Sequence, residues 1–174
     1  VDEAAKVIAA AGGRVLIAPR TVEKVGRLAM VADPEGGQFY VMRLTSGQLS
    51  NAFAVGLVGH CNWNELSTPS QTSAHAFYEA IFGWSNSAAM QMGPLGAYRF
   101  IDAEHLWVGA SMQDTAQPAL WRPFFRVRAI HKAARAVVEF GGAVLRGPHE
   151  VTGGNYLACC RDPQGAQFGI LGFR

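Results

Sequence analysis

The sequence predicts an α+β fold built from paired βαβββ units, and three observations lead to this prediction. A stretch near the N-terminus recurs 129 residues later, and each copy begins with apolar residues at helical spacing. A Gly-Gly pair ends each of these helical segments. Three short apolar segments follow, and Asp-Pro-x-Gly, a turn signal, separates the last two. One helix followed by a three-stranded meander is therefore expected in each copy.

The duplication decides the architecture. Residues 12–42 and 141–171 align without a gap and are identical at 13 of 31 positions, including the Gly-Gly pairs and the turns. Helices are expected over about 1–9 and 130–138. The expected strands are 14–17, 27–32 and 38–42 in the first copy, and 143–146, 156–161 and 167–171 in the second.

The segment between the copies has the same design. A helix is expected over 70–82, with Ser70 as its N-cap and Gly83 as its stop. The strands expected around it are 62–66, 86–92, 97–102, 106–112 and 120–127. We therefore predict the following organisation: the C-terminal part of a first module, its N-terminal part absent, over 1–43; a linker over 44–60; and a complete second module over 61–174. A naturally short first module is the alternative.

The composition excludes several function classes. Lys and Arg number 15 against 13 Asp and Glu, without a basic or acidic run, so no nucleic-acid partner is expected. No stretch of 18 apolar residues occurs, so no membrane partner is expected either. Three cysteines, Cys61 and the adjacent pair Cys159 and Cys160, favour a reducing compartment, and we expect a cytoplasmic location.

The order of these motifs resembles the vicinal oxygen chelate superfamily, the group of glyoxalase I, bleomycin-resistance and fosfomycin-resistance proteins and extradiol dioxygenases. The resemblance is closest to two-module glyoxalase-like proteins. It implies that pairs of units form cup-shaped, barrel-like mixed sheets, the glyoxalase/bleomycin-resistance fold. The residues that carry it are Trp63-Asn64-Glu65-Leu66-Ser67-Thr68, Ala76-Phe77-Tyr78, Phe82-Gly83-Trp84 and the duplicated Gly-Gly and Asp-Pro-x-Gly-x-x-Phe motifs.

In the enzymes of this superfamily, the cup holds a divalent metal bound by His and Glu from four strands. The positions of this chain that match two of those strands carry Trp63 and Arg122, which cannot serve as ligands. The last-strand position is Gly169 in the second module and Tyr40 in the first, and strand 106–113 contains no His, Asp or Glu. We therefore expect no metal and no other cofactor.

The histidines do not change this expectation. His75 falls on a helix, His60 in the linker, and His131 and His149 outside strand interiors, so each is expected to be solvated or to act as a cap.

Strand alternation predicts what lines the cup instead. Trp63 and Glu65 share one face of their strand, and Arg122 and Phe124 share one face of theirs. The predicted ligand pocket is Trp63, Glu65, Tyr98, Trp107, Arg122 and Phe124, with Phe100 on a neighbouring wall. The alternative is that Trp63, Trp107 and Trp121 are simply core residues.

Glu65 is the candidate catalytic residue. A carboxylate that faces an apolar cup should be paired or have a raised pKa. It could form a salt bridge with Arg122, a structural role, or act as a general base on a carbonyl-bearing substrate.

The preferred function is binding of a small hydrophobic or aromatic molecule in the strand-lined cup, without the usual metal. One alternative is a metal-dependent lyase or dioxygenase whose site lies in, or is completed by, the missing N-terminal unit. The other is a non-catalytic dimerisation module. The expected partner is a small molecule, with a homodimer as an open alternative; whether the protein is an enzyme stays undecided.

Overall fold

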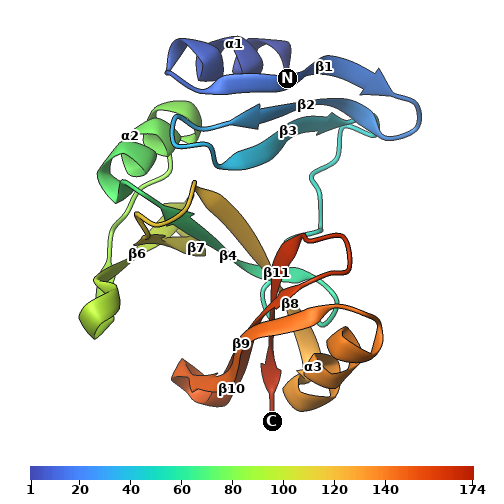
Figure 1. Ribbon diagram of the computed structural model, residues 1–174. Coiled ribbons are helices and arrows are strands. Elements are labelled where there is room, and N and C mark those ends of the chain that lie inside the picture. The colour runs from blue at the N-terminus through green and yellow to red at the C-terminus, as the bar shows by residue number, and fades with distance from the viewer. The chain divides into compact units, whose positions relative to one another are not determined.

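The computed structural model describes all 174 residues, and it is α+β as predicted (Figure 1). The N-terminal copy consists of α1 (Asp2–Ala10), β1 (Arg14–Val22), β2 (Gly26–Ala32) and β3 (Gln38–Leu44). Its three strands form an antiparallel sheet in the order β1-β2-β3, and α1 packs on β1 and β2. The predicted helix and meander are confirmed.

The central segment follows a stretch, 45–60, without helices or strands. Its elements are β4 (Cys61–Thr68), α2 (Gln71–Phe82), β5 (Ala89–Gln91), η1 (Gly93–Leu95), β6 (Ala97–Ala103) and β7 (Leu106–Gln113). The Ser70 hydroxyl accepts a hydrogen bond from the Ser73 amide, and Gly83 ends α2 in the left-handed conformation, as predicted.

The C-terminal copy repeats the first design. Its elements are β8 (Leu120–Ala129), α3 (Ile130–Glu139), β9 (Ala143–Val151), η2 (Thr152–Gly154), β10 (Asn155–Arg161) and β11 (Gln167–Phe173). β8 pairs with β11 in parallel, and the β9-β10-β11 meander is antiparallel, so this sheet is mixed.

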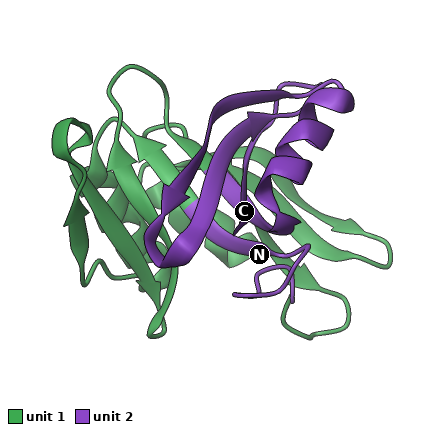
Figure 2. Ribbon diagram, turned by 90° about the horizontal axis from the view of Figure 1, so that it is seen from below, with its two compact units in different colours: residues 1–50, 65–121 green, residues 51–64, 122–174 purple.

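The chain divides into two compact units (Figure 2). Unit 1 comprises residues 1–50 and 65–121, and unit 2 comprises residues 51–64 and 122–174. Unit 1 holds the β1-β2-β3 sheet and the strand order β5-β6-β7-β4, whereas unit 2 holds the order β8-β11-β10-β9. Because β4 and β8 both cross the division, these units differ from the predicted modules, whose boundaries remain a prediction.

The turns of the two copies show the duplication at atomic detail. Asp33 Oδ1 accepts hydrogen bonds from the amides of Glu35 and Gly37, two and four residues later. Asp162 Oδ1 accepts from the amides at the same two offsets in its own turn. The glycine of each Asp-Pro-x-Gly turn has a φ near +97°, a conformation that L side chains rarely adopt.

Unit 1 has one hydrophobic core that joins the N-terminal copy to α2. Ile8 of α1 and Val31 of β2 are fully buried in it, together with Leu66 of β4. Phe77 and Tyr78 of α2 belong to the same cluster, so the helix is anchored by both sets of strands. The core of unit 2 lies under α3 and contains Ile130, Ala134, Ala158, Cys160 and Ile170.

Three strands, β1, β5 and β9, differ in length from the prediction by four residues or more. β5 covers only 89–91 of the expected 86–92, while β1 and β9 each run five residues beyond their expected ends. Pro19 lies within β1 and Pro148 lies within β9. Because β1 and β9 are edge strands, a missing amide donor is tolerated there. No helix of the structure is long and apolar enough to span a membrane.

Candidate ligand-binding site

The strands β5-β6-β7-β4 of unit 1 carry aromatic side chains on the face opposite α2. Leu66 and Ile101 point toward α2, so alternation places Glu65 and Phe100 on the opposite face. The Phe100 ring stacks on Trp107 at a centroid distance of 4.6 Å and meets Tyr98 edge-on at 5.9 Å. Three rings on two neighbouring strands therefore form a continuous apolar surface, which we call the aromatic face.

Glu65 is the acid of the aromatic face. Only 4% of its surface is exposed, and its Oε2 accepts a hydrogen bond of 3.3 Å from the Tyr98 hydroxyl. Trp107, in contrast, is 47% exposed. The structure thus brings together Glu65, Tyr98 and Trp107 of the predicted pocket within unit 1, and Phe100, also expected on a wall of the cup, lies with them.

In unit 2, the predicted pocket residues lie on the sheet face opposite α3. Phe124 is fully buried, and its ring lies directly over Gly169 of β11, where a Cβ would come within 1.9 Å of Phe124 Cδ1. The Arg122 guanidinium donates a hydrogen bond of 2.7 Å to Gln167 Oε1. Trp63, half-buried in β4, accepts a hydrogen bond from the Cys61 thiol at its carbonyl.

The residues at the strand positions matched to metal ligands do not fit a divalent cation. Arg122 is a cation, and Trp63 offers no lone pair suited to a hard metal. Gly169 has no side chain, and the ring of Phe124 occupies the space that a ligand there would need. No group of three or more His, Cys, Asp or Glu gathers in the structure. The chemistry of these residues therefore favours packing and anion contacts at these positions over coordination.

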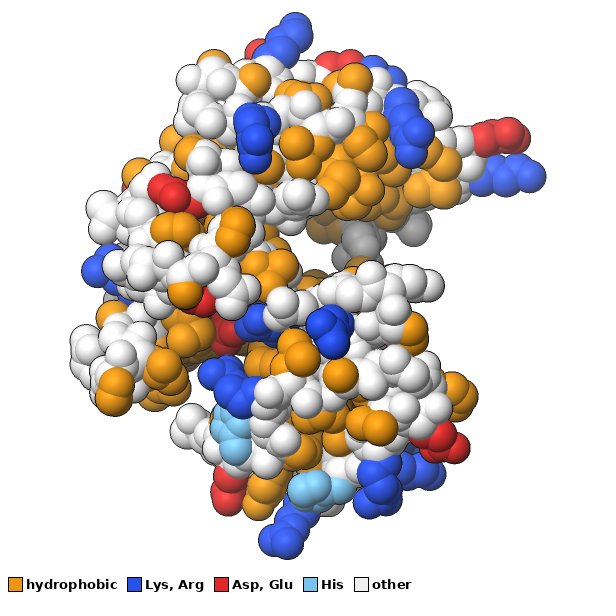
Figure 3. All heavy atoms as spheres, viewed as in Figure 1, with side chains coloured by type: hydrophobic (Ala, Val, Ile, Leu, Met, Phe, Trp, Pro, Cys, Tyr) orange, Lys and Arg blue, Asp and Glu red, His pale blue; other side chains and the backbone are white.

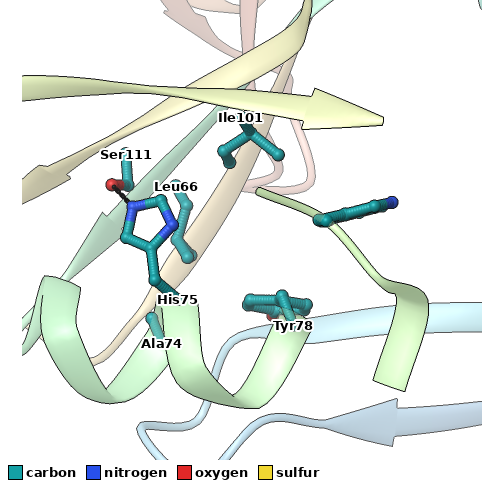
Figure 4. A pocket seen from close by; sticks show the side chains of 7 residues that line it. Leu66, Ala74, His75, Tyr78, Ile101 and Ser111 are labelled. Carbon is teal, nitrogen blue, oxygen red and sulfur yellow. Dashed lines mark hydrogen bonds between the residues drawn. The ribbon is translucent and has the colours of Figure 1, made fainter. Parts of the chain in front are cut away.

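A polar cluster that the sequence did not predict lies between α2 and the unit 1 sheet (Figure 4). His75 Nε2 is 2.8 Å from the Ser111 hydroxyl, which also accepts a hydrogen bond from Gln71 Nε2. His75 is half-buried, so the expectation of a solvated or capping histidine is wrong here. The small pocket beside it is lined by Leu66, Ala74, His75, Tyr78, Trp84, Ile101 and Ser111.

The electrostatics of this cluster keep the imidazole neutral. Burial lowers the pKa of His75, the Arg99 cation lowers the pKa further, and Glu79 opposes them. A neutral His75 can accept a hydrogen bond from the Ser111 hydroxyl at Nε2, while the same hydroxyl oxygen accepts a hydrogen bond from the Gln71 amide. The donors and acceptors of the three side chains are therefore matched. The i, i+4 spacing of Gln71 and His75 on one helix face was the only signal in the sequence.

His149 lies inside β9, opposite Leu157 of β10, so the expectation that it falls outside a strand was wrong, but its side chain is exposed, as expected of a solvated histidine. His60 precedes β4, in the expected linker, and is half-buried, with its Nδ1 3.3 Å from the Val58 carbonyl oxygen. His131 lies in the first turn of α3 with its ring 5.9 Å from that of Tyr156.

A second buried network joins the N-terminal copy to α2. The Tyr78 hydroxyl donates to Asp33 Oδ2 at 2.8 Å and accepts from Trp121 Nε1 at 2.7 Å. Burial raises the pKa of Asp33, whereas its hydrogen bonds from Tyr78 and the turn amides oppose the rise. Trp121 thus packs in the unit 1 core.

Comparison with known proteins gives relatives over nearly the whole chain. No protein-family model matches. The chain is 29% identical over 173 residues to "Putative glyoxylase CFP32" of Mycobacterium tuberculosis, covering 98% of this chain and 65% of that protein. It is 30% identical over 174 residues to the anthracycline biosynthesis protein DauV of a Streptomyces species, covering 99% of this chain and 62% of that protein. The chain thus spans less than two thirds of these relatives.

Solved structures share the fold. The 2,2',3-trihydroxybiphenyl 1,2-dioxygenase of Sphingomonas wittichii superposes with a TM-score of 0.64 over 98% of this chain and 65% of its own, at 14% identity. The Mn(II)-bound glyoxalase of Novosphingobium aromaticivorans superposes with a TM-score of 0.62 over 99% and 58%, at 18% identity. The duplicated motif and the relatives agree with this common fold, and together they support the vicinal oxygen chelate superfamily.

Proposed function

We propose that this protein binds a small hydrophobic or aromatic molecule on its strand-lined surfaces, without the metal that the superfamily's enzymes use. The aromatic face of unit 1 carries the proposal. Tyr98, Phe100 and Trp107 offer adjoining rings, and Glu65 adds a buried carboxylate held by the Tyr98 hydroxyl. Apolar walls with a few fixed polar groups are the usual composition of small-molecule sites.

Two further observations support this function. The ring of Phe124 over Gly169 fills one position matched to a metal ligand. The name of the DauV relative connects that protein with anthracycline biosynthesis, and a planar polycyclic ligand would suit an aromatic face. Glu65, fixed next to such a ligand, is the group we would assign to proton transfer if the protein catalyses a reaction.

Tryptophan fluorescence tests the proposal. We expect 1,8-dihydroxyanthraquinone, a planar uncharged probe, to quench the emission of the protein in a saturable manner. Trp107→Phe should remove most of the quenching, because Trp107 is half-exposed and stacked on Phe100. Trp84→Phe is the matched control, because Trp84 packs against the unit 1 core and should leave the quenching intact.

Metal removal separates the proposal from its rival. After dialysis against EDTA, the dissociation constant for the probe should stay within about twofold of its original value. Loss of binding that manganese or zinc restores would instead favour a metal-dependent lyase or dioxygenase. Absence of saturable quenching by the probe would contradict the proposed function.

A further inference from the structure

Methionines flank the aromatic face of unit 1. Met90 of β5 is paired with Tyr98 of β6, and paired residues lie on the same side of a sheet. On β7, Ser111 points toward α2, so the next residue, Met112, points to the opposite face, where the register places it beside Tyr98. Tyr98 therefore lies between two methionines, one on each neighbouring strand.

A third methionine extends this arrangement along β5. The Met92 amide donates a hydrogen bond of 2.8 Å to the Gly96 carbonyl, so the pairing continues just beyond the end of β5. Met92 is two residues from Met90 and therefore lies on the same side of the sheet. We call Met90, Met92 and Met112 the methionine rim, and it contains three of the five methionines of the chain.

The methionine rim and the aromatic face together expose apolar surface. Met90 is 41% exposed and Met92 is 39% exposed, close to the 47% of Trp107. Met112 is half-buried. Figure 3 shows hydrophobic side chains gathered over the part of unit 1 where Figure 1 places β6. An exposed apolar surface of adjoining side chains is typical of a binding site.

The width of this surface indicates the size of its ligand. The strands β5, β6 and β7 are neighbours in the sheet. Their spacing of about 4.8 Å gives about 10 Å between the side chains of the two outer strands. A single six-membered ring covers only one strand spacing, whereas a planar system of three fused rings covers the full width. The surface therefore matches a multi-ring ligand better than a single ring.

The two kinds of side chain suit such a ligand in different ways. The stacked rings of Phe100 and Trp107 offer flat apolar contact to the face of a ring system. A methionine thioether is polarisable, makes favourable contacts with the edges of aromatic rings, and has three rotatable bonds. The methionine rim can therefore follow the outline of ring systems that differ in shape, provided that they reach it.

We propose that the methionine rim and the aromatic face together select planar ligands of three or more fused rings. The ring faces lie against Trp107, and the ring edges lie against Met90 and Met92. This inference rests on the proposed function, narrows it to a class of ligand and assigns the residues that distinguish this class from smaller aromatic molecules.

A series of probes tests the ligand class. The probes are 2'-hydroxyacetophenone, 1-hydroxy-2-acetonaphthone and 1,8-dihydroxyanthraquinone, which carry a hydroxyl beside a carbonyl on one, two and three fused rings. Quenching of tryptophan fluorescence gives their dissociation constants. The three-ring probe should bind about tenfold or more tightly than the one-ring probe, because it buries more apolar area.

Methionine oxidation tests the site itself. Hydrogen peroxide transfers one oxygen atom to an accessible methionine sulfur and is reduced to water, and mass spectrometry measures the rate at each residue. Saturating 1,8-dihydroxyanthraquinone should slow the oxidation of Met90 and Met92 at least about threefold. Met42 of β3, which is 47% exposed, is the control within the same molecule, and its rate should not change.

Substitution measures the contribution of the rim. The double variant Met90→Ala with Met92→Ala should weaken binding of the three-ring probe by about fivefold or more and leave the one-ring probe nearly unaffected. Met42→Ala is the matched control and should bind all probes like the original protein. Unchanged thermal unfolding of these variants ensures that each result reports on binding.

The outcomes separate the two proposals. If 1,8-dihydroxyanthraquinone quenches saturably while Met90 and Met92 oxidise at unchanged rates, the proposed function survives and the methionine rim is wrong. If the one-ring probe binds as tightly as the three-ring probe, the ligand class is wrong. If Met42 is protected as strongly as Met90, the shielding is non-specific and the site is wrong. If none of the probes binds, both proposals fail.

Discussion

At two positions in this protein, Tyr78 and Gly169, the presence or absence of a single side-chain atom decides the packing. The Tyr78 hydroxyl both donates and accepts, and it connects Asp33 of the N-terminal copy with Trp121 at the start of β8. Gly169 is required because Phe124 fills the space above its Cα atom. Both cases lead to predictions, because removal or addition of one atom leaves the rest of the side chain in place.

Replacement of Tyr78 by Phe should destabilise the protein by about 1–3 kcal/mol, because Trp121 Nε1 and Asp33 Oδ2 then lose a buried partner. Chemical denaturation measures this as a lower free energy of unfolding. Tyr156→Phe serves as the control: its hydroxyl contacts exposed Glu150, so the change should stay within about 0.5 kcal/mol. Equal effects of the two variants would contradict the role of the buried network.

Replacement of Gly169 by Ala should also destabilise the protein, by about 1–3 kcal/mol, because the new methyl group overlaps the Phe124 ring. Combining Gly169→Ala with Phe124→Leu should cost less than the sum of the two single changes, because the smaller side chain makes room. Additive free energies of unfolding would show that the ring does not pack on this glycine.

At the scale of helices and strands, rules based on neighbouring residues predicted the ends of α2 but not the end of β9. Helix α2 begins and ends where Ser70 and Gly83 predict, because capping depends on residues adjacent in sequence. The end of β9 was predicted too early, since Gly147-Pro148 reads as a break unless the strand is known to lie at a sheet edge. His149 was misplaced for the same reason.

The packing of α2 on its sheet predicts a pH dependence of stability. The pKa of His75 is lowered in the folded protein, chiefly by burial and then by Arg99, so the unfolded chain binds the proton more readily. Above the unfolded pKa of about 6.5, both states are neutral and stability is complete. As the pH falls from about 6.5 toward the folded pKa, stability is lost.

Urea denaturation at a series of pH values between about 7.5 and 5 checks this prediction. His75→Gln should flatten the loss in this window, because the group that takes up the proton is gone. His131→Gln is the control, since this exposed residue lies on α3, away from the cluster. An unchanged slope in His75→Gln would assign the pH dependence to another group.

At the scale of the whole molecule, a duplicated sequence supports two different surfaces. The copies keep their turns and glycine pairs, yet the position of Tyr40 in the first copy is Gly169 in the second. Unit 1 presents aromatic rings opposite α2, and unit 2 presents arginines opposite α3. Duplication therefore conserved the backbone pattern, while the sheet faces took on different chemistry.

The sequence by itself determined the duplicated motif and the order of helices and strands, because both follow from local spacing and turn chemistry, and the motifs in that order also carry the resemblance to the superfamily. Alternation along one strand also placed Glu65 opposite Leu66 and Arg122 alongside Phe124. Only the tertiary structure decided which residues meet across strands: Tyr98 with Glu65, and Phe124 with Gly169. Register, bulges and edge positions set those contacts, and they arise from pairing between segments far apart in the chain.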